Sequence, residues 1–145
     1  MERLYALLLL NQSEFGGREE YLALLDRLFL ASPEADGILL ELEICAGDPK
    51  ASASLLNGYW AERWPRFPTA SFRRFLFGKL AQANGQAEDL GAFGRRAYRL
   101  WQLLPAPLWR EQPFWALSYA DDPLSWGDEA QTRGVYESLF REEAE

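Results

Sequence analysis

The sequence has no histidine, one cysteine (Cys45) and only two lysines among its 145 residues. Without histidine it cannot form a Ser-His-Asp or Cys-His catalytic arrangement, and it lacks the commonest metal ligand. A single cysteine excludes an intrachain disulfide and a cysteine-rich zinc site. A lone thiol is typical of a reducing cytoplasm. We therefore expect a cytoplasmic protein that is not an enzyme and has no metal or cofactor.

β-Branched residues are almost as scarce: one valine, two isoleucines and two threonines stand against 25 leucines. Strands are usually rich in β-branched side chains, whereas Leu, Ala, Glu and Arg lose little conformational freedom in a helix. This balance predicts an all-α fold. We expect residues 1–145 to form a single helical domain, a compact bundle of about six to seven short helices.

Two apolar segments have sequence features of both a helix and a strand. Residues 4–10 are either a buried helix or a strand, because a run of this length fits both. The run is too short to cross a bilayer, and no cleavage pattern of a signal peptide follows it, so no membrane association is expected. Residues 40–44 alternate as in a strand, but Ile38, Leu42 and Cys45 have helical spacing, which favours a helix. A helix would place Glu41 and Glu43 about 200° apart, whereas a strand would place them on one face as an acid–base pair.

Several residues are typical of helix starts. Asp48 precedes Pro49, Thr69 or Ser71 precedes an aromatic helix, and Asp128 has Gln131 three residues later, as in a capping box. The most regular helix is expected over residues 87–104. Within it, Gly91 and Gly94 lie one turn apart and would allow a neighbouring helix to approach closely.

Before the last helix, residues 105–126 form an aromatic segment interrupted by prolines at positions 105, 107, 113 and 123. The segment is too apolar for a free linker and too interrupted for one helix. We predict short helical turns held onto the body by their aromatic side chains. Long irregular segments in compact domains are often functional.

The densest acidic group lies at the end of this segment and has three interpretations. Its carboxylates form turns and helix caps, or they form a docking patch for a basic partner, or they bind Mg²⁺ or Ca²⁺. The spacing does not match an EF-hand loop, which disfavours a metal site. The predicted partner-binding residues are the acids and their two aromatic neighbours: Tyr119, Asp121, Asp122, Trp126, Asp128 and Glu129.

Charge also limits the partner. The formal net charge is −7, which disfavours nucleic acid and anionic membranes and favours a basic protein. The arginines at positions 73, 74, 95, 96 and 99 are expected either to form one patch for phosphate or carboxylate or to pair with surface acids. The sequence has no P-loop, Rossmann glycine pattern, G-x-S-x-G or H-E-x-x-H motif.

These properties favour a small acidic interaction protein that binds and neutralises a basic partner. In physical type, not in any motif, it is similar to the bacterial immunity proteins that neutralise toxic nucleases. The excess of arginine over lysine is typical of GC-rich coding sequence and agrees with a bacterial source. One alternative is a helical adaptor or chaperone that holds an amphipathic client segment in an aromatic groove over residues 109–126. A second is a carboxylate-based enzyme.

Overall fold

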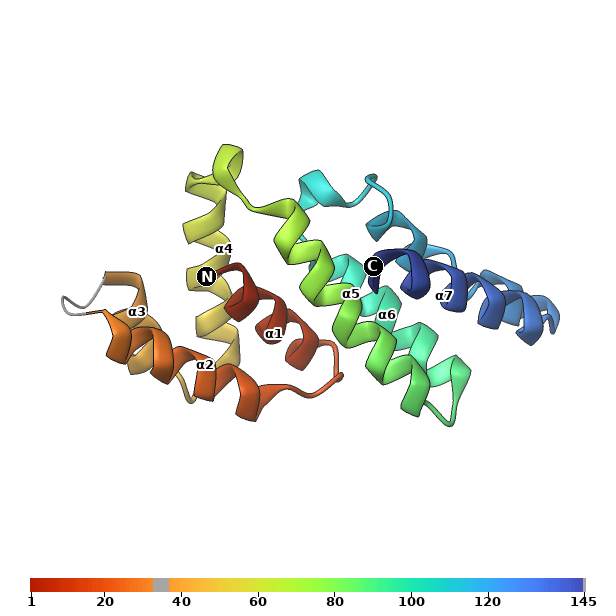
Figure 1. Ribbon diagram of the computed structural model, residues 1–145, viewed down its shortest axis with the longest axis horizontal. Coiled ribbons are helices and arrows are strands. Elements are labelled where there is room, and N and C mark those ends of the chain that lie inside the picture. Colours follow the sequence, from red (N-terminus) through yellow and green to blue (C-terminus); the bar gives the residue numbers. More distant parts are fainter. Residues whose placement is uncertain (33–36, 145) are drawn as a thin grey trace.

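The protein is an all-α bundle, as its composition predicts. The computed structural model describes residues 1–32 and 37–144, and within these ranges it contains seven α-helices, four short 3₁₀ helices and no strand. In chain order the elements are α1 (Glu2–Gln12), α2 (Arg18–Ala31), α3 (Gly37–Ile44), α4 (Pro49–Glu62), η1 (Trp64–Arg66), α5 (Thr69–Gln86), α6 (Leu90–Leu103), η2 (Ala106–Leu108), η3 (Phe114–Ser118), η4 (Asp122–Trp126) and α7 (Glu129–Ala144) (Figure 1).

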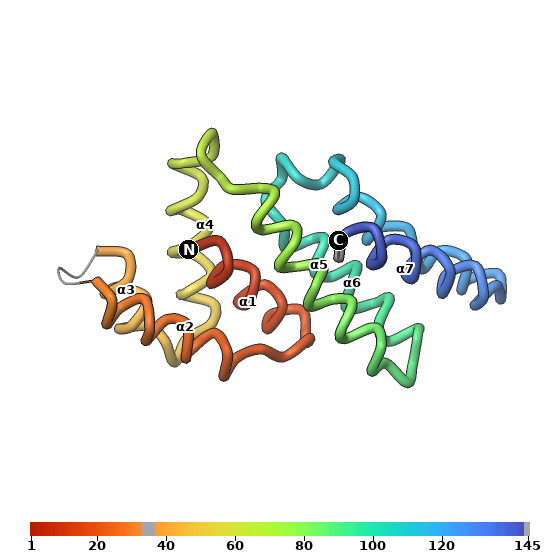
Figure 2. Tube along the Cα trace, viewed as in Figure 1, coloured from red at the N-terminus to blue at the C-terminus, as the bar shows by residue number. Residues whose placement is uncertain are grey.

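Helix α1 is the central element. Each residue from Leu4 to Leu10 is at most 3% exposed, because the helix contacts α2, α4, α5 and α6. The chain trace shows α1 in the middle, with α2 to α4 on one side and α5 to α7 on the other (Figure 2). A helix covered on all sides has no polar stripe, which is why periodicity did not distinguish this run from a buried strand.

The strand-like segment at residues 40–44 is helical and belongs to α3. Leu39 and Leu42 are buried, whereas Leu40 and Ile44 are exposed, so the alternation does not reflect alternating burial. Glu41 is exposed. Desolvation and the neighbouring Asp26 carboxyl raise the pKa of Glu43, so its interacting acid comes from α2.

Asp48 and Asp89 are the N-cap residues of α4 and α6. The Asp48 and Asp89 side chains accept hydrogen bonds from the backbone N–H of Ala51 and Ala92, each over 3.1 Å, which satisfies donors at the first turns of α4 and α6. The prediction that Thr69 or Ser71 caps α5 is wrong. Pro68 occupies that position, and the Ser71 hydroxyl instead donates to Glu2 on α1 over 2.8 Å.

The close approach predicted at Gly94 exists, but the neighbour is a turn and not a helix. A Cβ built on Gly94 would lie 2.7 Å from the Cβ of Asp121, which lies between η3 and η4. Only glycine leaves room for this contact. Gly91, by contrast, faces Asp89 and Arg95 near the start of its own helix.

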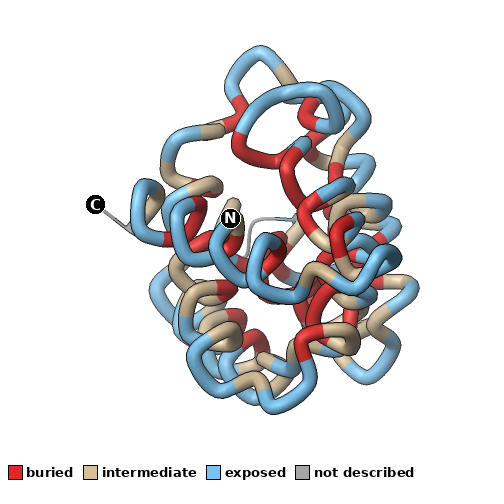
Figure 3. The backbone as a smooth tube through the Cα atoms, turned by 90° about the vertical axis from the view of Figure 1, so that its right-hand side faces the viewer, coloured by how far each residue is buried: buried red, intermediate tan, exposed pale blue. Residues whose placement is uncertain are grey.

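Buried residues gather in the interior of the backbone trace, and exposed residues lie mostly along its outer turns (Figure 3). Among the residues described, no helix combines the length and the apolar character needed to cross a membrane.

Candidate functional site

The proline-rich segment forms the turns η2, η3 and η4, as predicted, and it is held in place by two leucines and only one of its aromatic side chains, Phe114. Leu108, Phe114 and Leu117 are each at most 1% exposed. Turn η3 packs against α6, and η4 packs against α7. Most of the larger aromatic side chains of the segment therefore do not serve as its anchors.

Those aromatic side chains reach the surface instead. Trp115 is 48% exposed, Tyr119 40% and Trp126 64%. Trp115 and Tyr119 pack edge to face at 5.8 Å, and the Gln112 side-chain amide donates to the Tyr119 hydroxyl over 3.2 Å. Exposed Trp and Tyr are the side chains most enriched at protein-binding hot spots.

The four predicted acids divide into two pairs. Asp121 packs against Gly94, and burial, with the neighbouring Asp122 carboxylate, raises its pKa. Asp128 accepts the backbone N–H of Gln131 over 3.0 Å at the start of α7. Its own N–H donates to the Pro123 carbonyl, so the reciprocal bond of a capping box is absent. These two acids have structural contacts within the fold.

Asp122 and Glu129 remain exposed, although Glu129 also accepts a hydrogen bond from Arg133 one turn later, over 2.9 Å. We call Trp115, Tyr119, Asp122, Trp126 and Glu129 the C-terminal acidic surface. It includes four of the six predicted partner-binding residues. Trp115 is not one of the predicted six, because it lies six residues before the first acid of the group, Asp121.

The negative charge is concentrated in the same part of the chain. Residues 109–145 contain nine of the 22 acidic residues and three of the 15 basic ones, a formal charge of −6 out of the total of −7. The preceding 108 residues are nearly neutral. The exposed aromatic side chains of the described residues also all lie between positions 98 and 126. Charge and aromatic surface therefore coincide in sequence.

A shallow groove of about 490 Å³ lies between η3 and α7. Gln112, Ala116 and Tyr119 form one wall, and Val135 and Glu142 belong to the other. Tyr119 thus lines a concave surface whose walls combine apolar side chains with side-chain amides and a carboxylate. Such a concave surface can receive a side chain from a partner.

Three arginines of the predicted basic patch have partners within the fold. Arg73 pairs with Glu143 on α7 over 2.9 Å. Arg96 and Arg99 donate to the backbone carbonyls of Glu14 and Gln12. These two arginines therefore satisfy acceptors at and just beyond the C-terminal end of α1.

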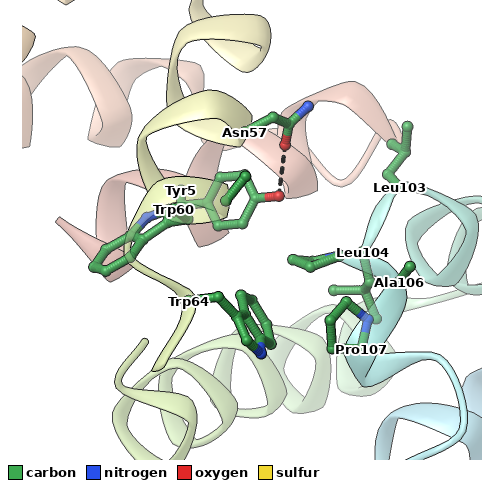
Figure 4. Close-up of a pocket in the computed structure, with 10 residues that line it drawn as sticks. Tyr5, Asn57, Trp60, Trp64, Leu103, Leu104, Ala106 and Pro107 are labelled. Atoms are coloured by element: carbon green, nitrogen blue, oxygen red, sulfur yellow. Dashed lines mark hydrogen bonds between the residues drawn. The ribbon is translucent and has the colours of Figure 1, made fainter. Parts of the chain in front are cut away.

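A separate cavity of about 400 Å³ lies between α4 and the connection from α6 to η2. Trp60 and Trp64 line one wall, and Leu104 and Pro107 the other (Figure 4). At one end the Tyr5 hydroxyl donates to the Asn57 side-chain oxygen over 2.6 Å. We call this space the Trp60–Trp64 cavity. In the sequence, Trp60 and Trp64 stand four residues apart, a spacing typical of the buried face of a helix and not of a ligand site.

In the described part of the chain, no group of three or more His, Cys, Asp or Glu side chains is placed to hold a metal ion. No protein-family model matches the sequence, and neither a curated protein nor a solved structure matches it.

Proposed function

We propose that this protein binds a basic protein partner through its C-terminal acidic surface and neutralises it, as a bacterial immunity protein does. One observation carries the proposal: residues 109–145 combine nearly all of the net negative charge with the exposed Trp115, Tyr119 and Trp126. Charge of one sign steers an oppositely charged partner, and exposed aromatic side chains provide anchors that become buried on binding.

The anchors are held before binding. The contact between Gly94 and Asp121 fixes the turn between η3 and η4 against α6. Tyr119 is the first residue of this turn, and Trp126 ends η4. A fixed turn lowers the entropy that these side chains lose when a partner orders them, which favours affinity. The small acidic chain and its lone thiol support action in a bacterial cytoplasm.

The test is to produce the protein with the product of the adjacent gene and to measure the affinity at low and at high salt. We expect a complex that weakens as salt rises, because the steering charges are screened. Trp126→Ala should lower the affinity by about 30-fold, the effect of a hot-spot residue. The matched control is Ile44→Ala on α3, which truncates an exposed apolar side chain outside the C-terminal acidic surface.

A second pair of variants tests the charge. Asp122→Lys should slow association, whereas Glu19→Lys on α2, also an exposed acid, should change it far less. If the adjacent gene encodes a basic toxin and no complex forms at low salt, the immunity function is wrong. If a complex forms and neither Trp126→Ala nor Asp122→Lys weakens it, the assigned surface is wrong.

The adaptor function has one supporting observation, the groove between η3 and α7. An amphipathic client segment would place its apolar side chains beside Ala116 and Val135. This binding would depend little on salt, because apolar burial would dominate it. A complex that persists at high salt and is lost on Val135→Glu would favour the adaptor.

A further inference from the structure

The Trp60–Trp64 cavity has walls that are held in place by an aromatic cluster. The buried Phe67 ring lies 5.0 Å from the Trp60 ring and 4.7 Å from the Trp64 ring, and it contacts Tyr5 edge to face at 6.4 Å. Tyr5 in turn belongs to the buried helix α1. Because each of these side chains is fixed by its neighbours, binding in the cavity would require little rearrangement.

The lining excludes charged ligands. No Asp, Glu, Lys or Arg is among the described residues that line the cavity, and only Tyr5 and Asn57 bring oxygen-bearing side chains. A charged group placed here would lose its hydration without gaining an opposite charge. Two indole side chains opposite leucine and proline favour a flat, apolar ring. The volume of about 400 Å³ lies within the range of small-molecule sites, roughly 300–1,000 Å³.

The polar end favours an amide. The Tyr5 hydroxyl uses its hydrogen on the Asn57 oxygen, so its own oxygen can still accept a hydrogen bond. The Asn57 nitrogen is turned away from Tyr5 (Figure 4) and has two hydrogens to donate. A ligand that carries both a carbonyl and an N–H would therefore find a donor on Asn57 and an acceptor on Tyr5 at this end of the cavity.

From these contacts we propose that the Trp60–Trp64 cavity binds a small uncharged ligand that joins a flat apolar ring to an amide. The site shares no residue with the C-terminal acidic surface. It is therefore independent of the proposed function and would add ligand binding to a protein-binding protein.

The experiment compares three probes that share a benzene ring: benzamide, benzoate and benzylamine. Binding is followed by ligand-observed NMR and by the shifts of the tryptophan indole N–H signals. We expect benzamide to bind at least about 10-fold more tightly than either charged probe, because a tenfold preference corresponds to only about 1.4 kcal/mol. The shifted indole signals should include that of Trp64, identified by its loss in Trp64→Phe.

Ala61 and Ala106 line opposite walls and are both exposed, so a larger side chain at either position fills the cavity from its open side. Ala61→Phe should abolish benzamide binding, and Ala23→Phe, at an exposed position on α2, should leave it unchanged. Circular dichroism checks the fold, and Ala106→Phe replaces Ala61→Phe if the latter unfolds.

The proposal is overturned if no probe binds, if all three bind equally, or if benzamide binding survives both cavity-filling variants. Asn57→Ala separates the amide from the ring. We expect it to weaken benzamide by at least about fivefold, the order of one lost hydrogen bond, while toluene binding stays unchanged. Equal loss for toluene and benzamide would contradict the assigned role of Asn57.

Discussion

Replacing Gly94 with alanine tests how the candidate surface is held in place. In an exposed helix interior, Gly→Ala stabilises by about 0.5–1 kcal/mol, because glycine loses more backbone freedom on folding. At Gly94 the new Cβ would lie 2.7 Å from the Cβ of Asp121. Both atoms are attached directly to backbone, so the side chains cannot rotate away and the turn between η3 and η4 must move.

Overpacking of this kind typically costs about 1–3 kcal/mol, which exceeds the gain in helix propensity. We therefore expect Gly94→Ala to destabilise the protein by roughly 1–2 kcal/mol. For a chain of this size that is a fall in Tm of about 3–7 °C. Differential scanning calorimetry and urea denaturation both measure it.

The matched controls are Gly78→Ala in α5 and Gly134→Ala in α7, where an added Cβ meets no atom within 4 Å. Each should raise the free energy of unfolding by about 0.5–1 kcal/mol. Removing the opposing Cβ with Asp121→Gly should convert Gly94→Ala into a similarly stabilising change, a strong non-additivity. If Gly94→Ala alone stabilises as much as Gly78→Ala, the packing of this turn on α6 is refuted.

Three further predictions concern single polar groups. Asp121→Asn should raise Tm at neutral pH. Because folding raises the pKa of Asp121, the wild type loses stability as pH rises through that pKa, so the advantage of the variant should disappear as pH falls. An advantage that is constant with pH would contradict this assignment. Asp128→Ala removes the acceptor of the Gln131 N–H and should cost about 1 kcal/mol in urea denaturation; no loss would show that the bond contributes little. Tyr5→Phe should cost about 0.5–1.5 kcal/mol through its lost bond to Asn57, and Asn57→Ala should then add little in the Tyr5→Phe background, since the two changes remove one interaction.

The fold class follows from the sequence because helix preference accumulates along the whole chain, and 25 leucines with one valine leave little material for strands. Local capping can also be predicted from sequence, as Asp48 and Asp128 show, because the capping carboxylate and the backbone N–H that donates to it lie within one turn. Ser71 shows the limit. Its partner is Glu2, 69 residues away, so no local pattern could indicate that it leaves the cap position.

The sequence does not indicate which side chains of the proline-rich segment are buried. Turns of three to five residues are too short for a period to reveal which face is buried. The sequence therefore located the aromatic and acidic residues but did not show that Phe114 is buried while Trp126 is exposed, or that Asp121 faces inward. The Trp60–Trp64 cavity requires residues from α4 and from the α6–η2 connection, a pairing that only the folded chain creates.

The burial of Leu4 to Leu10 in α1 has a consequence for biosynthesis. This helix is translated before α6, which begins at Leu90 and is one of the elements that cover it. Until that point is translated, Leu4 to Leu10 remain without their full cover, and a nascent chain that exposes such a run is prone to aggregate. Slow translation or truncation before α6 should therefore harm this protein more than the loss of residues after α6, because the former removes one of the helices that cover its most apolar segment.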